Sequence, residues 1–520
     1  MRLVGLGHRA HTADVRETFG FESYGGRVDD SLEVNIAAGT VRGMHDGDTR
    51  TWRGIPFAAP PVGERRLRAP GPVEPWSGVR DATRFGPVAP QDRKGPFAGA
   101  SAGTPQSEDC LTLNVVAPPD QAGGLPVMVY IHGGAYGVGS PADSPFRGVN
   151  FARRGVIHVT LNYRLNAFGY LDFSEFGFDN NLGLRDQVAA LEWVRDNIAA
   201  FGGDPANVTV YGESSGANAV TTLLTTPAAH GLFARAIAQS PPSNAVYRPD
   251  VTRQWAREFL QILGAEPGCE AEALRTATPA ALVRAARLLF VRIPDEYPGD
   301  QVFSPVVDGE YLPEHPVEAL RAGRGHPVPL IIGSNDREGT VFFGKRRILA
   351  TTRARMNGLL ANTSAAAADL MRATYRLPRR RGAIDFAGDF AFWLPTYQIA
   401  EGHSTIAPTW MYRLDYAPPL LRAVGIGSTH GADLLTVFDR TRAWVGRLVT
   451  LLGGRGALAS VGRRMQDYWL TYATDGTVDA TWPRHDPEQR ASLIFDNPDR
   501  VEYDTRSDRR AAWDQFIHLH

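Results

Sequence analysis

Short apolar runs alternate with stretches of helical periodicity along most of this chain. The runs are too short for helices and are bounded by glycine, proline or polar residues, which is typical of buried strands. Between 182 and 201, Leu184, Val188, Leu191, Val194 and Ile198 keep helical spacing, and a pair of glycines ends the helix. A second helix is expected at 217–224. The predicted strands are 127–131, 156–165, 208–211, 329–333 and 409–414. Alternation of this kind predicts an α/β fold, a mostly parallel twisted sheet with helices on both faces.

The periodicity also divides the chain. Residues 1–32 are polar and without clear period, so we expect an N-terminal extension that is frayed or loosely docked. Residues 33–520 are predicted to form one domain, with mainly helical insertions at about 240–310 and 339–400 and a surface loop at 91–107. His8, His11 and Asp14 are metal-ligand types, but no partner cluster follows them, so no metal site is expected.

Composition excludes several classes of protein. The 520 residues carry 55 basic and 56 acidic side chains, a net charge of −1 that offers no footprint for nucleic acid. No apolar run reaches the roughly 18 residues of a membrane-spanning helix, and the start of the chain lacks a signal-peptide core. The two cysteines, Cys110 and Cys269, are then expected to be reduced. All but two of the basic residues are arginine, which favours a bacterial source. We therefore expect a cytoplasmic protein without a membrane partner; the sequence does not indicate its oligomeric state.

The motif Gly212-Glu213-Ser214-Ser215-Gly216 stands between a predicted strand and a predicted helix. This G-x-S-x-G pattern is typical of a sharp turn that holds a nucleophilic serine above a sheet. A serine hydroxyl needs a neighbouring base, oriented by an acid, and donors for the oxyanion that forms. The loop His132-Gly133-Gly134-Ala135-Tyr136 follows another strand, and its backbone amides could supply those donors together with the amide of Ser215.

Several further blocks make the resemblance plain. The chain resembles the type-B carboxylesterase, or cholinesterase-like, family of α/β-hydrolases from about 33 to 500. The blocks are RGIPF at 53–57, PPVG at 60–63, SEDCLTLN at 107–114, NYR at 162–164, and the stretches 181–187 and 201–205.

The resemblance implies an α/β-hydrolase fold, a small-molecule ester substrate and no cofactor. It places the nucleophile at Ser214, the acid at Glu338 and the base at His430, with the oxyanion hole formed by the amides of Gly134, Ala135 and Ser215. The other acids considered are Asp336 and Asp308, and the other bases are His132, His403 and His485. With His430 as base, activity should rise with pH through a value near 7.

Some positions depart from the family pattern. Ala135 stands where many members carry a third glycine, Ser215 replaces an alanine, and Pro241-Pro242 follow Ser240 where a glycine is usual. The resemblance further implies room for bulky alcohol groups. The same machinery could instead serve a carbamate, an amide, acyl transfer or a natural-product tailoring step, and a non-catalytic binding protein is the remote alternative. Four aromatic residues of the second insertion, Phe390, Phe392, Trp393 and Tyr397, fall in a segment that in the family often lines the acyl side of the pocket. Ordinary helix packing explains each of them at least as well, so they are left out of the site.

Overall fold

The computed structural model describes residues 27–92, 99–100, 103–120, 123–142, 146–342 and 348–516. The first 26 residues, with His8, His11 and Asp14, lie outside this range, as does part of the predicted loop at 91–107. Strand β1 (Arg27–Ile36) begins inside the segment that the sequence assigns to the N-terminal extension, and it pairs with the next strand. Those last residues of the extension therefore belong to the sheet.

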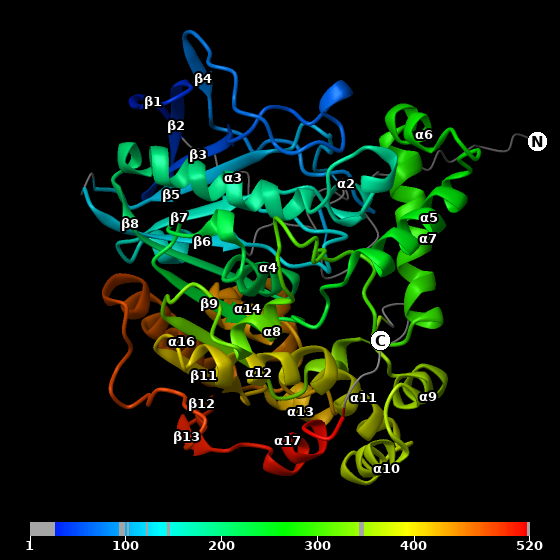
Figure 1. The fold of residues 1–520 in the computed structure, drawn as a ribbon. Helices are drawn as coiled ribbons and strands as arrows, with labels where there is room; N and C mark the ends of the chain where they lie inside the picture. Colours follow the sequence, from blue (N-terminus) through cyan, green and yellow to red (C-terminus); the bar gives the residue numbers. More distant parts are fainter. Residues whose placement is uncertain are drawn as a thin grey trace, which may run out of the picture.

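One sheet runs through the molecule (Figure 1). Its order is β1-β2-β3-β5-β7-β6-β8-β9-β10-β11-β12-β13, and the seven strands from β7 to β12 in this order are parallel. The parallel strands are β7 (Ile157–Leu161), β6 (Leu125–Ile131), β8 (Gly203–Glu213), β9 (Arg235–Gln239), β10 (Leu330–Asn335), β11 (Thr409–Leu414) and β12 (Ala491–Phe495). The antiparallel strands at the two ends are β1, β2 (Gly39–Asp46), β3 (Thr49–Pro56), β5 (Thr112–Ala117) and β13 (Arg500–Tyr503), while the short β4 (Val79–Asp81) pairs with β2.

Alternate residues of each central strand enter different cores. In β6, Val127, Val129 and Ile131 join one buried cluster, whereas Met128 and Tyr130 join the other. A strand that is buried on both faces reads as a continuous apolar run, and this is why the runs predict the strands well. Helices α3 (Leu182–Asn197) and α4 (Ser215–Leu223) cover the first face, and α16 (Arg455–Asp475) covers the second.

The other helices fill the connections. The first predicted insertion holds α5 (Pro249–Leu263), α6 (Glu270–Thr276) and α7 (Pro279–Glu296), and the second holds α9 (Arg353–Ala361), α10 (Ala365–Thr374), α11 (Arg380–Gly388), a π turn (Asp389–Trp393) and α12 (Leu394–His403). The remaining helices are α1 (Val149–Ala152), α2 (Asn166–Tyr170), α8 (Pro316–Arg321), α13 (Pro419–Ala423), α14 (Ala432–Val437), α15 (Trp444–Val449) and α17 (Ser507–Trp513). In Figure 1 the groups α5–α7 and α9–α11 lie at the same side of the sheet, one above the other. Within the described ranges, no helix combines the length and the apolar character that crossing a membrane requires.

One predicted strand is too long. The apolar run at 156–165 predicts a strand to its end, but β7 stops at Leu161. The Asn162 amide then donates to the Thr112 carbonyl, and Arg164 turns into a buried ion pair with Asp186, at 2.6 Å between Nη2 and Oδ1. Burial therefore continues through a loop, and an apolar pattern alone does not distinguish the two.

Candidate active site

Ser214 occupies the sharp turn between β8 and α4. Its backbone has φ 59° and ψ −128°, a region that residues other than glycine rarely adopt and that costs about 1–3 kcal/mol. The two motif glycines allow this turn because a side chain at either position would collide with the neighbouring backbone. A Cβ at Gly212 would lie 2.5 Å from the carbonyl group of Gly216, and one at Gly216 would lie 2.0 Å from the Ile131 carbonyl oxygen. The close backbone contacts of the strained turn therefore explain why the motif has glycine at 212 and 216.

His430 and Glu338 meet Ser214 at the carboxyl edge of the sheet. Glu338 lies just after β10, and His430 lies in the loop between α13 and α14, which follow β11. His430 Nε2 is 2.9 Å from Ser214 Oγ, and His430 Nδ1 is 2.7 Å from Glu338 Oε2. Parallel strands bring their carboxyl ends to one edge, so three residues far apart in sequence form a continuous hydrogen-bonded row.

The alternative acids are engaged elsewhere. Asp336 Oδ1 accepts from Arg506 Nη2 at 2.8 Å, and Asp308 Oδ2 accepts from Asn181 Nδ2 at 3.1 Å. Both carboxylates therefore have structural partners other than a catalytic histidine.

The alternative bases are also held by other groups. His132 stacks on Tyr163, with ring centroids 4.5 Å apart. His403 Nε2 lies 2.8 Å from the Val328 carbonyl oxygen, and His485 Nδ1 lies 3.0 Å from that of Ala491. Of the histidines considered from sequence, His430 is the one that the structure places on Ser214.

Glu338 is fixed by a serine that the sequence did not single out as functional. Ser240 Oγ donates to Glu338 Oε1 at 2.6 Å, and the Asn335 amide donates to the same oxygen at 2.5 Å. Ser240 itself has φ 53° and is fully buried. Both donors hold Oε1 and leave Oε2 directed at His430. In the sequence Ser240 stood out only because two prolines follow it.

A second carboxylate faces the histidine. Glu213 Oε1 lies 3.3 Å from His430 Nε2, the nitrogen that also meets Ser214. Burial raises the pKa of Glu213 to about 8, with Asp433 and Glu338 adding to the rise although His430 opposes it. Asp433 is itself buried, and its Oδ2 accepts from Gln239 Nε2 at 2.7 Å. In the sequence Glu213 occupies a variable position of the G-x-S-x-G motif, so the pattern does not indicate that it contacts the histidine.

These acids set the charge of the histidine. Burial lowers the pKa of His430, but three surrounding carboxyl groups outweigh that effect and raise the pKa to about 9. The charge of Glu213 is the largest single raising effect, Glu338 acts through both its hydrogen bond and its charge, and Asp433 acts through its charge. This environment favours a pKa above 7, and the pH at which activity rises stays a prediction.

Two aromatic rings pack on the imidazole. Phe392 stacks on His430 with ring centroids 4.2 Å apart, and Phe342 lies at 5.2 Å. Phe392 is left out of the site on sequence grounds, whereas its ring stacks on His430 and limits the orientations open to the imidazole. Its contact depends on a pairing across the fold that periodicity does not reveal.

The glycine loop after β6 passes directly beside the nucleophile. A Cβ at Gly133 would lie 3.0 Å from Ser214 Cβ, and Gly134 and Ala135 have φ values of 125° and 53°. Within the described parts of the chain, the amides of Gly134 and Ala135 donate to no acceptor. The Ser215 amide belongs to the first turn of α4, where a helix has no acceptor of its own. Three free amides thus belong to the segments that meet at Ser214.

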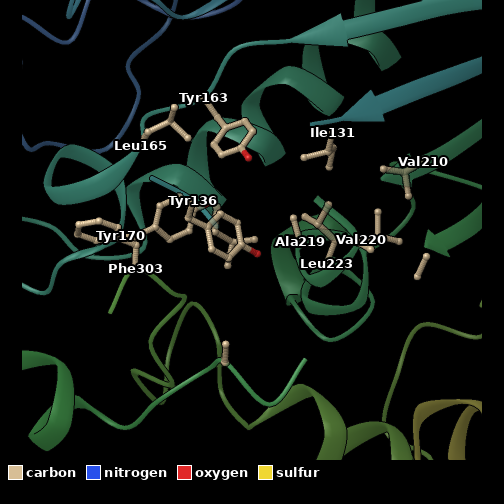
Figure 2. Close-up of a cluster of buried hydrophobic side chains, with 14 of the residues drawn as sticks. Ile131, Tyr136, Tyr163, Leu165, Tyr170, Val210, Ala219, Val220, Leu223 and Phe303 are labelled. Carbon is tan, nitrogen blue, oxygen red and sulfur yellow. The ribbon is translucent and has the colours of Figure 1, made fainter. Parts of the chain in front are cut away.

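Tyr136 holds this loop in place. Its amide donates to Ser215 Oγ at 3.2 Å, which ties the loop to the start of α4. Its ring stacks on Tyr170 with centroids 4.1 Å apart. Figure 2 shows Tyr136 among the side chains of Tyr163, Tyr170 and Phe303. The hydroxyl of Ser215, a departure from the family pattern, therefore has a structural contact. In the described residues no group of three or more histidine, cysteine, aspartate or glutamate side chains could hold a metal ion.

Comparison with known proteins agrees with this arrangement. The para-nitrobenzyl esterase of Bacillus subtilis (strain 168) is 38% identical over 495 residues, covering 92% of this chain and 97% of that protein. The fumonisin B1 esterase of Sphingopyxis macrogoltabida is 34% identical over 489 residues, covering 90% and 86%. A solved structure of a PNB esterase superposes with a TM-score of 0.82 at 35% identity, covering 92% of this chain and 99% of that one.

These neighbours have the α/β-hydrolase fold, as the sequence predicts for this chain. The model of the carboxylesterase family matches residues 30–513. The chain therefore belongs to the carboxylesterase family of enzymes.

Proposed function

We propose that the protein hydrolyses carboxylic esters through an acyl-serine intermediate, with Ser214, His430 and Glu338 as the triad. The observation that carries this proposal is the row of two hydrogen bonds, 2.9 Å from Ser214 to His430 and 2.7 Å from His430 to Glu338. A nucleophile, a base and an orienting acid within hydrogen-bond distance form the arrangement that acyl transfer requires.

The first step uses both ring nitrogens of His430. A carboxylate only accepts hydrogen bonds, so Glu338 fixes the proton on Nδ1 and leaves Nε2 free to accept the Ser214 proton. As Ser214 Oγ attacks the ester carbonyl carbon, the proton passes to Nε2 and Glu338 stabilises the imidazolium. The proton then goes to the departing alcohol, and the acyl group remains on Ser214.

The oxyanion is assigned to the backbone amides of Gly134, Ala135 and Ser215. Donors in a rigid, buried setting stabilise the developing charge without reorganising, and each is worth roughly 10²–10³ in kcat. Water, activated by His430, attacks the acyl carbon in the second half of the cycle, and the same amides serve again.

The substrate is proposed to be a small-molecule ester. Support comes from the relatives, which are named for a para-nitrobenzyl ester and for fumonisin B1. Acyl and alcohol preference depends on the walls of the site, where this chain carries Phe342 and Phe392 against the histidine.

The test is hydrolysis of p-nitrophenyl acetate and butyrate by the purified protein beside Ser214→Ala. Loss of the nucleophile should lower kcat by about 10⁴–10⁶. Ser507→Ala, at an exposed serine in α17, is the matched control and should retain full activity. A Ser214→Ala protein that keeps its melting temperature and its activity would refute the triad, and labelling of Ser214 by a small fluorophosphonate checks its reactivity independently.

A further inference from the structure

The short helix α15 and the turn after it expose large apolar side chains to solvent. Trp444 is 69% exposed, Leu448 49%, Leu451 69% and Leu452 61%. Trp444 and Leu448 lie four residues apart on one face of α15, and Leu451 and Leu452 follow in the turn after the helix ends at Val449. Scattered exposed apolar residues are ordinary, but four large ones within nine residues mark a surface for interaction. We call these four residues the α15 surface.

The opposite face of α15 holds the helix against the protein. Gly446 is buried, and a Cβ there would lie 2.3 Å from the Arg440 carbonyl oxygen. Thr450 is buried and donates through Oγ1 to the Gly446 carbonyl at 2.7 Å. Val449 packs on the core cluster beneath α16. The apolar face is therefore directed outward by a close fit, and rotation of the helix cannot bury it.

Arginines accompany the α15 surface. Arg442, Arg447 and Arg455 are exposed, and no aspartate or glutamate occurs between 440 and 466; the nearest acids in sequence are Asp439 and Asp467. Arg447 Nε donates to the Arg442 carbonyl at 3.0 Å, and Arg455 Nε donates to Thr450 Oγ1 at 3.3 Å. Neither arginine forms an ion pair with a carboxylate in the part of the chain that the structure describes, and the overall charge of the chain is only −1.

We propose that the α15 surface docks the enzyme on an anionic lipid membrane. A helix with tryptophan and leucine on one side and arginine beside them lies in the plane of a lipid interface, its apolar side chains among the acyl chains and its cations at the headgroups. A second copy of the chain fits this surface poorly, because a two-fold contact places the same patch on itself and sets arginines against arginines.

This docking needs no membrane-spanning helix, so it is consistent with the absence of one among the described residues. The proposal differs from the sequence-based expectation of no membrane partner, which rested on the lack of a span. It is also independent of the proposed chemistry. Docking would bring the enzyme to esters that dissolve in lipid rather than in water.

The experiment is vesicle flotation of the full chain without substrate. Vesicles of phosphatidylcholine mixed with phosphatidylglycerol are compared with vesicles of phosphatidylcholine alone, each at low and high salt. We expect binding to the anionic vesicles, weakened by salt. Arg442→Gln with Arg447→Gln should weaken it by about 25-fold, because each cation contributes about fivefold. Trp444→Ser with Leu448→Ser should abolish binding to the anionic vesicles.

The matched control is Leu288→Ser with Val291→Ser in α7, where the side chains are 60% and 61% exposed. This variant should bind like the parent, and the melting temperatures of all variants verify folding. Equal binding by the Trp444/Leu448 variant, binding to neutral vesicles alone, or no binding at all would each overturn the proposal. So would a dimer in sedimentation that Trp444→Ser with Leu448→Ser dissociates, since the surface would then join two copies.

Discussion

Replacement of Glu213 by glutamine tests how the buried acids control the catalytic candidate. Glu213 Oε1 lies 3.3 Å from His430 Nε2, and the charge of Glu213 is the largest single effect that raises the pKa of His430. Glutamine keeps the size and the hydrogen-bonding reach of the side chain but removes its charge. The substitution therefore changes the electrostatics of the site with little change in packing.

The expected size of the effect follows from the pKa values. A rise of the His430 pKa from 6.5 to about 9 favours the protonated ring by about 3 kcal/mol. The base must be neutral, so the alkaline limb of kcat/KM should lie well above neutrality, in the range where Glu213 also carries its charge. Without the Glu213 charge we expect the limb to fall by about one to two pH units. Relative to its own alkaline plateau, kcat/KM at pH 8 should then rise by about five- to tenfold.

The assay is kcat/KM for p-nitrophenyl acetate measured from pH 5 to pH 10 for the parent and for Glu213→Gln, with spontaneous hydrolysis subtracted. Glu74→Gln, at an acid whose side chain is 78% exposed, is the control and should leave the limb in place. A parent profile that levels off below pH 7, or a limb that Glu213→Gln does not move, would refute the reasoning that the buried carboxylates hold the proton on His430.

Three further predictions concern the neighbours of the site. Glu338→Gln should lower kcat by about 10⁴, because an amide does not fix the imidazole tautomer, with KM nearly unchanged; steady-state kinetics checks this. Ser240→Ala removes a bond to a charged acceptor worth about 1.5–3 kcal/mol and should lower kcat by about tenfold, and an unchanged kcat and pH limb would show that the serine does not position Glu338. Asp186→Ala leaves Arg164 buried without its partner and should cost about 3–5 kcal/mol of unfolding free energy in urea titration, whereas Asp196→Ala, from an exposed pair, should cost less than about 1 kcal/mol.

Much of the fold was predictable because a strand that is buried on both faces of the sheet appears in the sequence as a short continuous apolar run. The runs before the glycine loop and the nucleophile became β6 and β8, and those at 329–333 and 409–414 became β10 and β11. The prediction of strands fails where a buried segment is not a strand, or where a strand is formed by polar residues. Leu165 is buried in a loop that reads like a strand, and β1 forms from a polar stretch whose pairing with β2 the local pattern does not show.

The candidate site divides in the same way. Ser214, Glu338 and His430 lie in motifs with a local signature, and the structure brings these three together. Ser240 and Phe392 were missed because their roles exist only through contacts across the fold. Ser240 meets an acid 98 residues away, and nothing in its neighbourhood in sequence indicates that partner. Local motifs identify the reacting groups, whereas the groups that hold them require the tertiary structure.

The carboxyl edge of the sheet explains how such distant groups stay in register. Beyond the ends of the strands, the Ser214 amide donates to the Gln239 carbonyl at 2.9 Å, and the Ser240 amide donates to the Gly333 carbonyl at 2.8 Å. Ser214 thus extends the pairing of β8 with β9 by one residue, and Ser240 extends the pairing of β9 with β10 by one residue. Both serines take a positive φ at that point. The strain turns each hydroxyl to its partner while the backbone stays bonded to the next strand. The positions of the nucleophile and of the serine that holds the acid are therefore set by sheet hydrogen bonds rather than by flexible side chains.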